Sequence, residues 1–243
     1  MILSIQNARK IYGMKKAIDG ISFAVDEGEI IGYLGPNGSG KTTTIKAIVN
    51  QIELSGGTVK VFDYDVKNDF TRCYGMVGAI FEKNGLYERL SGKENIDLYL
   101  SACGVKLDKA QYDSLVERLD LTDGIDKPVN TYSKGMKRKL ALLRCLLANH
   151  KLLLLDEPFD GIDIECRADI VKLIKEFNKT NKTTIILTSH VMADIEDLAS
   201  RIIVIKKGNI LCDESMVEFN HREGNNLTEK YLEAISDEKQ ELA

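Results

Sequence analysis

Short apolar runs alternate with longer amphipathic stretches along the 243 residues of the chain. The short runs are rich in β-branched residues and leucine and fit strands, whereas the longer stretches repeat apolar residues at helical spacing. The expected strands are Ile2–Ile5, Ile21–Val25, Val59–Phe62, Ile30–Leu34, Val77–Phe81, Leu152–Leu155 and Thr184–Thr188, followed by Ile202–Ile205 and Ile210–Leu211 as a hairpin around Gly208. We expect the first three to form an N-terminal, largely antiparallel layer.

Helical spacing marks six further segments. They are Thr42–Val49, Ser91–Cys103, Asp108–Leu119, Ser133–Ala148, Ile164–Phe177 and a polar helix from Leu227 onward. Ser91 and Glu94 fit a capping box, which places a helix start there. Alternating strands and helices predict an α/β fold with a mostly parallel sheet covered on both faces. Between about Gly85 and His150 only helical patterns occur, so we expect an α-helical insert in the core.

Composition and charge narrow the classes of function. Lys and Arg number 33 against 37 Asp and Glu, and this net charge of −4 argues against nucleic acid or anionic lipid as the main partner. No run of about 18 apolar residues offers a membrane span, and the first residues lack the pattern of a signal peptide. Five scattered cysteines without a Cys-x-x-Cys pair favour reduced thiols in a cytosolic protein over metal or redox chemistry.

A glycine-rich loop follows the predicted strand Ile30–Leu34 and precedes a predicted helix. Its sequence, Gly35-Pro36-Asn37-Gly38-Ser39-Gly40-Lys41-Thr42-Thr43, contains the pattern G-x-x-x-x-G-K-[ST]. Glycines let backbone N–H groups point at phosphate oxygens, and the helix adds the positive end of its dipole. Lys41 is expected to reach the β- and γ-phosphates, and the Thr42 hydroxyl to ligate Mg²⁺. A glycine turn that binds nothing is the alternative.

Two carboxylates end the apolar strand Leu152–Leu155. Asp156 comes first and Glu157 second. A buried carboxylate needs a partner, and the carboxyl end of strands in an open α/β sheet is where ligands bind. Asp156 is therefore the expected carboxylate on the magnesium side. Glu157, which points differently, is expected to polarise the attacking water.

Three further segments, taken in order, resemble the ABC ATPase family. Tyr132-Ser133-Lys134-Gly135-Met136 is similar to the family's Leu-Ser-Gly-Gly-Gln signature. Phe159-Asp160-Gly161-Ile162-Asp163 stands where the family has its D-loop, and Thr188-Ser189-His190 where it has its switch histidine. The resemblance runs from Tyr12 to about Leu211. Without it, Ser133 and Asp163 fit ordinary helix caps and His190 an ordinary surface or core histidine.

The resemblance implies roles for individual residues. Ser133 and Gly135 would bind the phosphates of ATP held by a second copy, and Asp163 would communicate across that dimer. Glu157 would be the general base and His190 would contact the γ-phosphate. Tyr12 would stack on adenine, unless it is a plain strand-end tyrosine. Glu82, where the family usually has the Q-loop glutamine, would ligate Mg²⁺ or position water.

The resemblance also implies an organisation for the chain. It is a single ABC ATPase domain with a RecA-like core at 1–84 and 151–215. The helical subdomain spans about 85–150, and the C-terminal helix about 227–243. ATP and Mg²⁺ would be the cofactors. The expected partners are a second ATPase subunit and a separate transmembrane permease, which would dock near the Glu82 loop and the helical insert at the cytoplasmic face of the cell membrane.

Three positions depart from the family's pattern. Glu82 replaces the glutamine, Lys134 replaces the first signature glycine, and Met136 replaces the signature glutamine. Among ABC ATPases this combination is most similar to the exporters of antimicrobial peptides and drugs, including lantibiotic and bacitracin self-protection systems. Lys134 would lie near the partner's phosphates or in solvent.

Four other functions fit parts of the sequence. An ABC importer ATPase shares every motif. A soluble ABC ATPase acting on ribosomes or DNA would usually have two ATPase units or a long coiled coil, and the chain has neither. A P-loop kinase or GTPase would lack the ordered Ser133 and His190 motifs, whereas a degenerate subunit that binds ATP without hydrolysis would lack intact Glu157 and His190. The sequence therefore favours an ATP-hydrolysing subunit that drives export by dimer closure.

Overall fold

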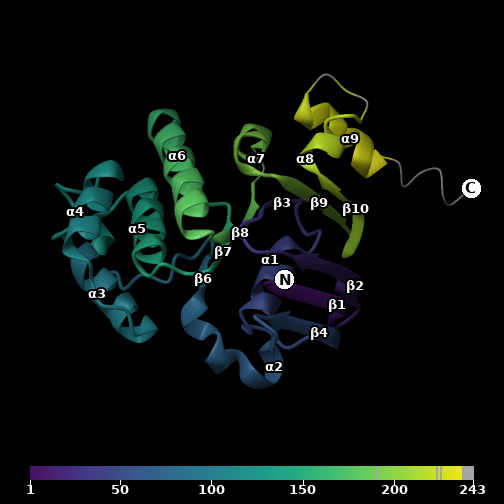
Figure 1. The fold of residues 1–243 in the computed structure, drawn as a ribbon, viewed down its shortest axis with the longest axis horizontal. Helices are drawn as coiled ribbons and strands as arrows, with labels where there is room; N and C mark the ends of the chain where they lie inside the picture. The colour runs from purple at the N-terminus through teal and green to yellow at the C-terminus, as the bar shows by residue number, and fades with distance from the viewer. Residues whose placement is uncertain (190, 223, 225, 237–243) are drawn as a thin grey trace, which may run out of the picture.

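The computed structural model describes residues 1–189, 191–222, 224 and 226–236, whose strands form two sheets (Figure 1). One is antiparallel with the order β2-β1-β4-β5. The other has the order β10-β9-β3-β8-β7-β6 and is parallel except for the pair β9 and β10. The strands are β1 (Leu3–Tyr12), β2 (Lys15–Val25), β3 (Ile30–Leu34), β4 (Gly56–Val61), β5 (Tyr64–Asp65), β6 (Val77–Ile80), β7 (Leu152–Asp156), β8 (Thr184–Thr188), β9 (Arg201–Lys206) and β10 (Asn209–Ser215).

Helices cover the parallel sheet. Helices α3, α4 and α5 lie together at one end of the molecule, and α7, α8 and α9 lie near β9 and β10 (Figure 1). The helices are α1 (Lys41–Ile48), α2 (Val66–Asp69), α3 (Gly92–Cys103), α4 (Lys109–Arg118), α5 (Lys134–Leu147), α6 (Ile164–Asn181), α7 (Met192–Leu198), α8 (Met216–Phe219) and α9 (Leu227–Ser236), with short 3-10 turns at Phe70–Arg72, Tyr74–Met76 and Val129–Thr131.

The two faces of the parallel sheet build two apolar cores. In β3, Ile31 and Tyr33 pack with α1 and the antiparallel sheet, whereas Ile30 and Leu34 pack with residues of α5, α6 and α7. All four are less than about one-tenth exposed. A strand buried on both faces reads as a continuous apolar run, because successive side chains point to opposite faces and both faces are covered. The expected fold class is confirmed.

The predicted strands and helices all occur, with some changes in their bounds. Strands β1 and β2 extend beyond the predicted segments to Tyr12 and back to Lys15. Asn7 has a left-handed φ of 48° and the pairing register shifts between Ile5 and Ala8. This bulge breaks the alternation of apolar and polar residues, which hides the second half of β1 from a pattern search.

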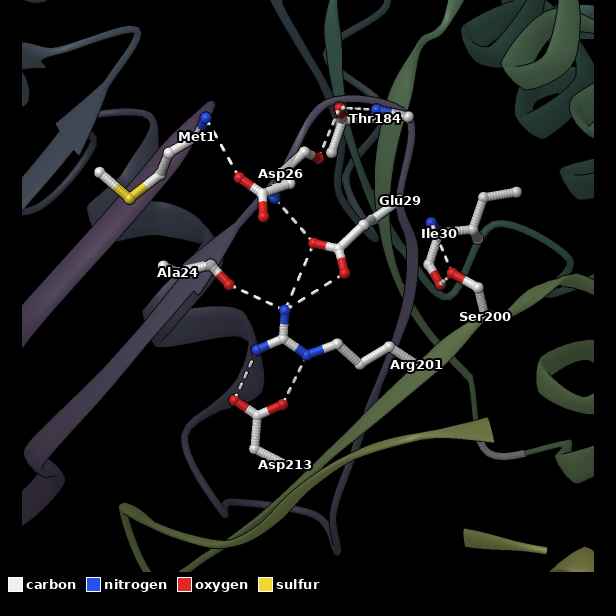
Figure 2. A network of polar contacts seen from close by, with 10 residues as sticks. Met1, Ala24, Asp26, Glu29, Ile30, Thr184, Ser200, Arg201 and Asp213 are labelled. Atoms are coloured by element: carbon white, nitrogen blue, oxygen red, sulfur yellow. Dashed lines mark hydrogen bonds and ion pairs between the residues drawn. The ribbon is translucent and has the colours of Figure 1, made fainter. Parts of the chain in front are cut away.

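A polar network joins the two sheets where β2 leads into β3 (Figure 2). The Arg201 guanidinium of β9 donates to both oxygens of Asp213 at 2.6 and 2.7 Å, to the Ala24 carbonyl at 2.9 Å, and to Glu29 at 3.3 Å. Glu29 in turn accepts from the Asp26 backbone N–H at 2.7 Å. The planar fork of arginine suits such multiple acceptors. The network fixes β3, and thus the glycine loop after it, relative to both sheets.

Within the part of the chain that the structure describes, no helix combines the length and apolarity that crossing a bilayer requires.

Candidate nucleotide site

The glycine loop turns tightly between the end of β3 and the start of α1. A Cβ atom at Gly35 would lie 2.1 Å from the Ile205 carbonyl oxygen, and one at Gly40 would lie 2.5 Å from the Ala17 carbonyl oxygen. Gly40 also has a φ of 119°, which side-chain-bearing residues rarely adopt. The β9–β10 hairpin supports the loop from behind, since the Gly208 N–H donates to the Ser39 carbonyl at 2.8 Å. Only glycine fits these two positions.

Lys41, the first residue of α1, folds back over the loop. Its ammonium donates to the carbonyl oxygens of Gly35 at 2.6 Å and Pro36 at 3.3 Å. Burial lowers the pKa of Lys41, and the nearby carboxylates of Glu157 and Asp156 oppose that shift. The side chain is therefore a cation held by exchangeable carbonyl contacts, and phosphate oxygens can replace them at little cost.

The end of β7 places Asp156 against two hydroxyl groups. Asp156 is 5% exposed, and its two oxygens accept from Thr42 at 2.8 Å and from Thr188 at 2.8 Å. Thr42 belongs to α1 and Thr188 ends β8, so three elements meet at this carboxylate. The expected neighbourhood of Thr42 and Asp156, which lie 114 residues apart in the chain, is present.

Glu157 leaves the strand direction at once. Its φ is 51°, in the left-handed region, and its backbone N–H donates to the Thr188 hydroxyl at 3.0 Å. Non-glycine residues in that region are uncommon and cluster at functional sites. Glu157 therefore has a backbone conformation unlike that of the strand residue Asp156 before it, and both residues line the same pocket.

These residues line one pocket of about 530 Å³. It brings together most of the residues that the sequence nominates for nucleotide and metal. Three lining residues were not predicted: Lys15, Ala17 and Asp160. The full lining is Tyr12, Lys15, Ala17, Asn37, Gly38, Gly40, Lys41, Thr42, Thr43, Glu82, Asp156, Glu157 and Asp160.

Lys15 carried a signal that a sequence search could have used. Tyr12 pairs with Lys15 across the two-residue turn between β1 and β2, and a glycine at such a turn is a hairpin signal. The Tyr12 ring is 48% exposed, with the Lys10 ammonium 4.8 Å from its centroid. The Tyr12 ring, which lines the pocket, thus lies close to the Lys10 ammonium.

Oxygen ligands for a hard cation are present in the same pocket. Thr42 supplies a hydroxyl, and Asp156 and Glu82 supply carboxylates. Among the described residues no group of three or more His, Cys, Asp and Glu side chains forms a complete metal cage. Proteins usually bind Mg²⁺ through one or two carboxylates together with substrate phosphates, and Thr42, Asp156 and Glu82 are the residues that would hold it here.

Of the nominated loop residues, Gly35, Pro36 and Ser39 are not among the residues that line the pocket, and three further nominated residues lie on other segments. Of the described residues that line the pocket, none is Ser133, Gly135 or Asp163. Ser133 caps α5 by accepting from the Met136 N–H at 3.1 Å, and Asp163 caps α6 by accepting from the Cys166 N–H at 2.9 Å. Both caps are exposed at the surface. Hydrogen bonding to the Cys166 backbone N–H lowers the pKa of Asp163.

The signature segment and the D-loop segment touch within the chain. A Cβ atom at Gly135 would lie 2.6 Å from the Gly161 carbonyl oxygen. Lys134 covers Gly161; its side chain is 63% exposed to solvent, as one of the two expectations for it requires, and its ammonium lies 2.7 Å from Asp160. Because Asp160 lines the pocket, this ion pair connects the N-terminus of α5 with the nucleotide site.

The predicted switch residue His190 lies outside the described residues. Its neighbour Ser189 is 5% exposed, donates to Asp194 of α7 at 3.0 Å and accepts from the Val191 N–H at 3.0 Å. Ser189 therefore connects the end of β8 with α7. The role expected for His190 stays a prediction.

Comparison with known proteins gives a family for this site. A family model described as "ABC transporter" matches residues 18–160. The ABC transporter ATP-binding protein YdbJ of Bacillus subtilis is 38% identical over 88% of this chain and 70% of its own length. The daunorubicin resistance ATP-binding protein DrrA3 of Streptomyces coeruleorubidus is 33% identical over 91% and 71%. The bacitracin transport ATP-binding protein BcrA of Bacillus licheniformis is 32% identical over 96% and 74%.

Solved structures agree. An ATP-binding subunit of an ABC transporter superposes with a TM-score of 0.87 at 26% identity, covering 97% of this chain and 100% of that one. A dimeric bacterial ABC transporter cassette, MJ0796, shares the fold with a TM-score of 0.82 at 23% identity over 88% and 99% of the two chains. The phosphate loop, the paired carboxylates and these matches together show that the chain belongs to the ABC transporter family, as an ATP-binding and ATP-hydrolysing subunit.

Proposed function

We propose that this chain energises the export of a drug or antimicrobial peptide through a separate transmembrane subunit. One observation carries the ATPase part: Lys41, the hydrogen-bonded pair Thr42 and Asp156, and Glu157 all line a single pocket. Export is supported by the names of two relatives, one a daunorubicin resistance protein and one a bacitracin transport protein. The departures at Glu82, Lys134 and Met136 point to the same exporters.

In this proposal the nucleotide lies along the pocket from its rim to the acidic end. The adenine stacks on Tyr12, and Lys15 beside it adds positive charge for the phosphates. Backbone N–H groups of Asn37 to Thr43 and the Lys41 ammonium bind the phosphates, with the dipole of α1 behind them. Such contacts position the γ-phosphate, and positioning with charge stabilisation is most of what phosphoryl transfer needs.

Thr42, Asp156 and Glu82 would hold Mg²⁺ with the phosphates. The metal supplies neutralisation of the charge that builds up on the transferred phosphoryl group. Asp156 is suited to this site because its carboxylate is buried and accepts hydrogen bonds from two neutral hydroxyl groups, those of Thr42 and Thr188, so a cation would compensate its charge.

Glu157 is the proposed general base. It lines the pocket directly after Asp156 with a left-handed backbone, and in the proposal one carboxylate serves the metal and the other the water. His190 is proposed to contact the γ-phosphate, and the test of that role is substitution, since the residue lies outside the described part of the chain.

Ser133, Gly135 and Asp163 are proposed to act on the ATP of a second copy. They lie outside the pocket of their own chain, and Ser133 and Asp163 are exposed. A γ-phosphate bound from both chains favours the closed dimer, and hydrolysis removes that bridge. The structural relative MJ0796 is described as dimeric, which supports the same arrangement here.

The permease is proposed to dock beside the Glu82 loop, at the cytoplasmic face of the membrane. A groove of about 560 Å³ lies between this loop and the start of α5. Its lining carries both signs of charge, with Glu82 and Glu88 beside Lys83, Lys134 and Lys137, and Lys137 forms an ion pair with Glu88 at 2.7 Å. A groove that borders both the pocket and the signature helix can transmit closure to a bound partner.

Transport direction can be tested in membrane vesicles that contain this chain and the membrane protein encoded beside it. With ATP supplied outside, inside-out vesicles should accumulate daunorubicin or bacitracin, and vesicles with Lys41→Ala should not. ATP-driven loss of preloaded compound from the same inside-out vesicles would indicate import and would contradict the proposal.

A further inference from the structure

A buried arginine lies directly beneath the Glu82 loop. Arg138 of α5 is 1% exposed. Its Nη1 group donates to the Phe81 carbonyl at 2.7 Å and to the Asn84 side-chain oxygen at 2.9 Å. These acceptors stand on either side of Glu82 in the chain, so the guanidinium holds both ends of the short segment that presents Glu82 to the pocket.

The same guanidinium faces the negative end of the nucleotide site. The carboxylates of Asp160, Asp156, Glu157 and Glu82 all attract it and raise its pKa, against the larger lowering that burial causes. All four carboxylates line the pocket. Arginine stays protonated in proteins, and so Arg138 is a permanent positive charge behind four acidic groups.

Two of the nitrogen groups of Arg138 do not take part in hydrogen bonds with the described residues. Among the described residues, its buried Nε and Nη2 groups have no hydrogen-bond acceptor. A buried charge without a direct ion pair is costly for stability. Its retention is therefore better explained by the electrostatic field that it exerts on the pocket than by a contribution to folding.

A second arginine provides a comparison on the same helix. Arg144 donates to the carbonyl oxygens of Asn84 and Gly85, and its guanidinium stacks 4.7 Å from the Tyr99 ring. Arg144 thus also holds the loop, but from the side of α3. Of these two arginines, only Arg138 both holds the loop and interacts with the carboxylates of the pocket.

We propose that Arg138 is a positioning residue for ATP hydrolysis, which fixes the Glu82 loop and offsets the extra negative charge that Glu82 brings to the pocket. This inference rests on the proposed catalytic site. It also gives a reason why a carboxylate is compatible with position 82. A glutamate there adds a charge beside Asp156 and Glu157, and Arg138 compensates it from below.

The test is a double-mutant cycle on the purified chain, with kcat and KM for ATP measured at saturating Mg²⁺. Arg138→Gln can still donate an amide N–H to the loop but removes the charge. We expect kcat to fall about tenfold with a small change in KM, which corresponds to roughly 1.4 kcal/mol of lost charge stabilisation. In the double variant, Glu82→Gln should raise kcat about threefold or more above that of Arg138→Gln alone, because it removes one negative charge.

Two further variants separate charge from packing. Arg138→Lys keeps the charge, so its kcat should exceed that of Arg138→Gln. Should Arg138→Gln not fold, Arg138→Met, which removes the charge but keeps the aliphatic stem, carries the same cycle. Arg144→Gln is the control: it should lower the melting temperature, and Glu82→Gln should not relieve whatever activity it loses.

Two results would overturn the inference. One is a kcat of Arg138→Gln equal to that of the unsubstituted chain. The other is a loss in Arg138→Gln and Arg138→Lys that is equal and is not relieved by Glu82→Gln, because that result makes Arg138 a packing residue. Failure of the catalytic assignment itself would show separately, as native-rate hydrolysis by Glu157→Gln.

Discussion

Single charges in the pocket have effects that can be measured one at a time. Lys41 is half-buried and bound only to loop carbonyls in the structure, so its ammonium should contribute directly to phosphate binding. We expect Lys41→Ala to weaken ATP binding about tenfold or more in a calorimetric titration, the range of a charge-assisted contact. Lys46, on the same helix, is the matched control. An affinity of Lys41→Ala equal to that of Lys46→Ala would contradict the assignment.

His150 is a buried histidine outside the nucleotide site. It is 2% exposed; its Nδ1–H donates to the Gly75 carbonyl at 2.9 Å, and its Nε2 accepts from the Tyr99 hydroxyl at 2.8 Å. Burial lowers the pKa of His150. The folded chain therefore keeps this imidazole neutral, joining α3 to the segment before β6.

A dependence of stability on pH follows from His150. In the unfolded chain the imidazole binds a proton as the pH falls below 6.5, whereas in the folded chain it resists protonation. The free energy of unfolding should thus fall between pH 6.5 and 5, by up to about 1.4 kcal/mol per pH unit. Urea titrations should show a shallower fall for His150→Gln but the full fall for the exposed control His221→Gln. Equal slopes for all three chains would count against a neutral His150.

Whether the sequence predicts a site residue depends on the sequence pattern directly around that residue. Lys41, Asp156 and Glu157 were predicted because each adjoins a strong local pattern, a glycine loop or a buried strand. The sequence does not indicate Asp160 as a site residue, because its ion pair with Lys134 joins two segments that are separate in the chain. Arg138 reads in sequence as one cation of a basic helix. Only the packing of α5 under the Glu82 loop reveals its burial.

At the scale of elements, capping residues predicted helix starts well. Ser91, Asp108 and Ser133 each cap the expected helix, and the capping box of Ser91 with Glu94 is present. The short helix α8 was missed although Ser215 and Glu218 form a second capping box. A helix of four residues has too little periodicity to stand out, and its stability comes from packing.

Helix α7 was missed for a related reason. It has seven residues, and Val191 before it provides no side-chain cap. Its position depends on contacts that are distant in sequence: Ile195 packs against Gly32 of β3, where a Cβ atom would lie 2.6 Å from the Ile195 side chain. Tertiary packing of this kind has no signature in a single sequence.

The network around Arg201 should stabilise the junction of the two sheets (Figure 2). Arg201→Met keeps the aliphatic stem but leaves Asp213 and Glu29 without the guanidinium. We expect the free energy of unfolding to fall by about 2 kcal/mol, as for a partly buried, bidentate pair. Lys16→Met, which breaks an exposed pair with Asp19, should cost less than about 0.5 kcal/mol. Equal losses of unfolding free energy for the two variants, measured by chemical denaturation, would show that the network stabilises the chain no more than an exposed ion pair does.

At the scale of the whole molecule, the antiparallel sheet, the parallel sheet and the group α3, α4 and α5 have the expected layout (Figure 1). The division into a core at 1–84 and 151–215, a helical subdomain at about 85–150 and a C-terminal helix stays a prediction. Helix α9 covers 227–236, and residues 237–243 of the predicted C-terminal helix lie outside the described part.

The molecule as a whole separates two sets of residues that the proposed chemistry needs together. Lys41 and Glu157 share one pocket, whereas Ser133 lies at the exposed start of α5, outside it. In the proposed function, a second copy brings its Ser133 to the phosphates held by the first chain. The proposal therefore predicts that two copies associate when ATP is bound.

Light scattering of Glu157→Gln tests this claim most directly. The substitution should slow hydrolysis and preserve ATP, so the measured mass should change from one chain to two when ATP and Mg²⁺ are saturating. The double variant Glu157→Gln with Ser133→Arg should bind ATP but keep the mass of one chain. A single-chain mass for Glu157→Gln, with ATP shown to be bound, would contradict the account.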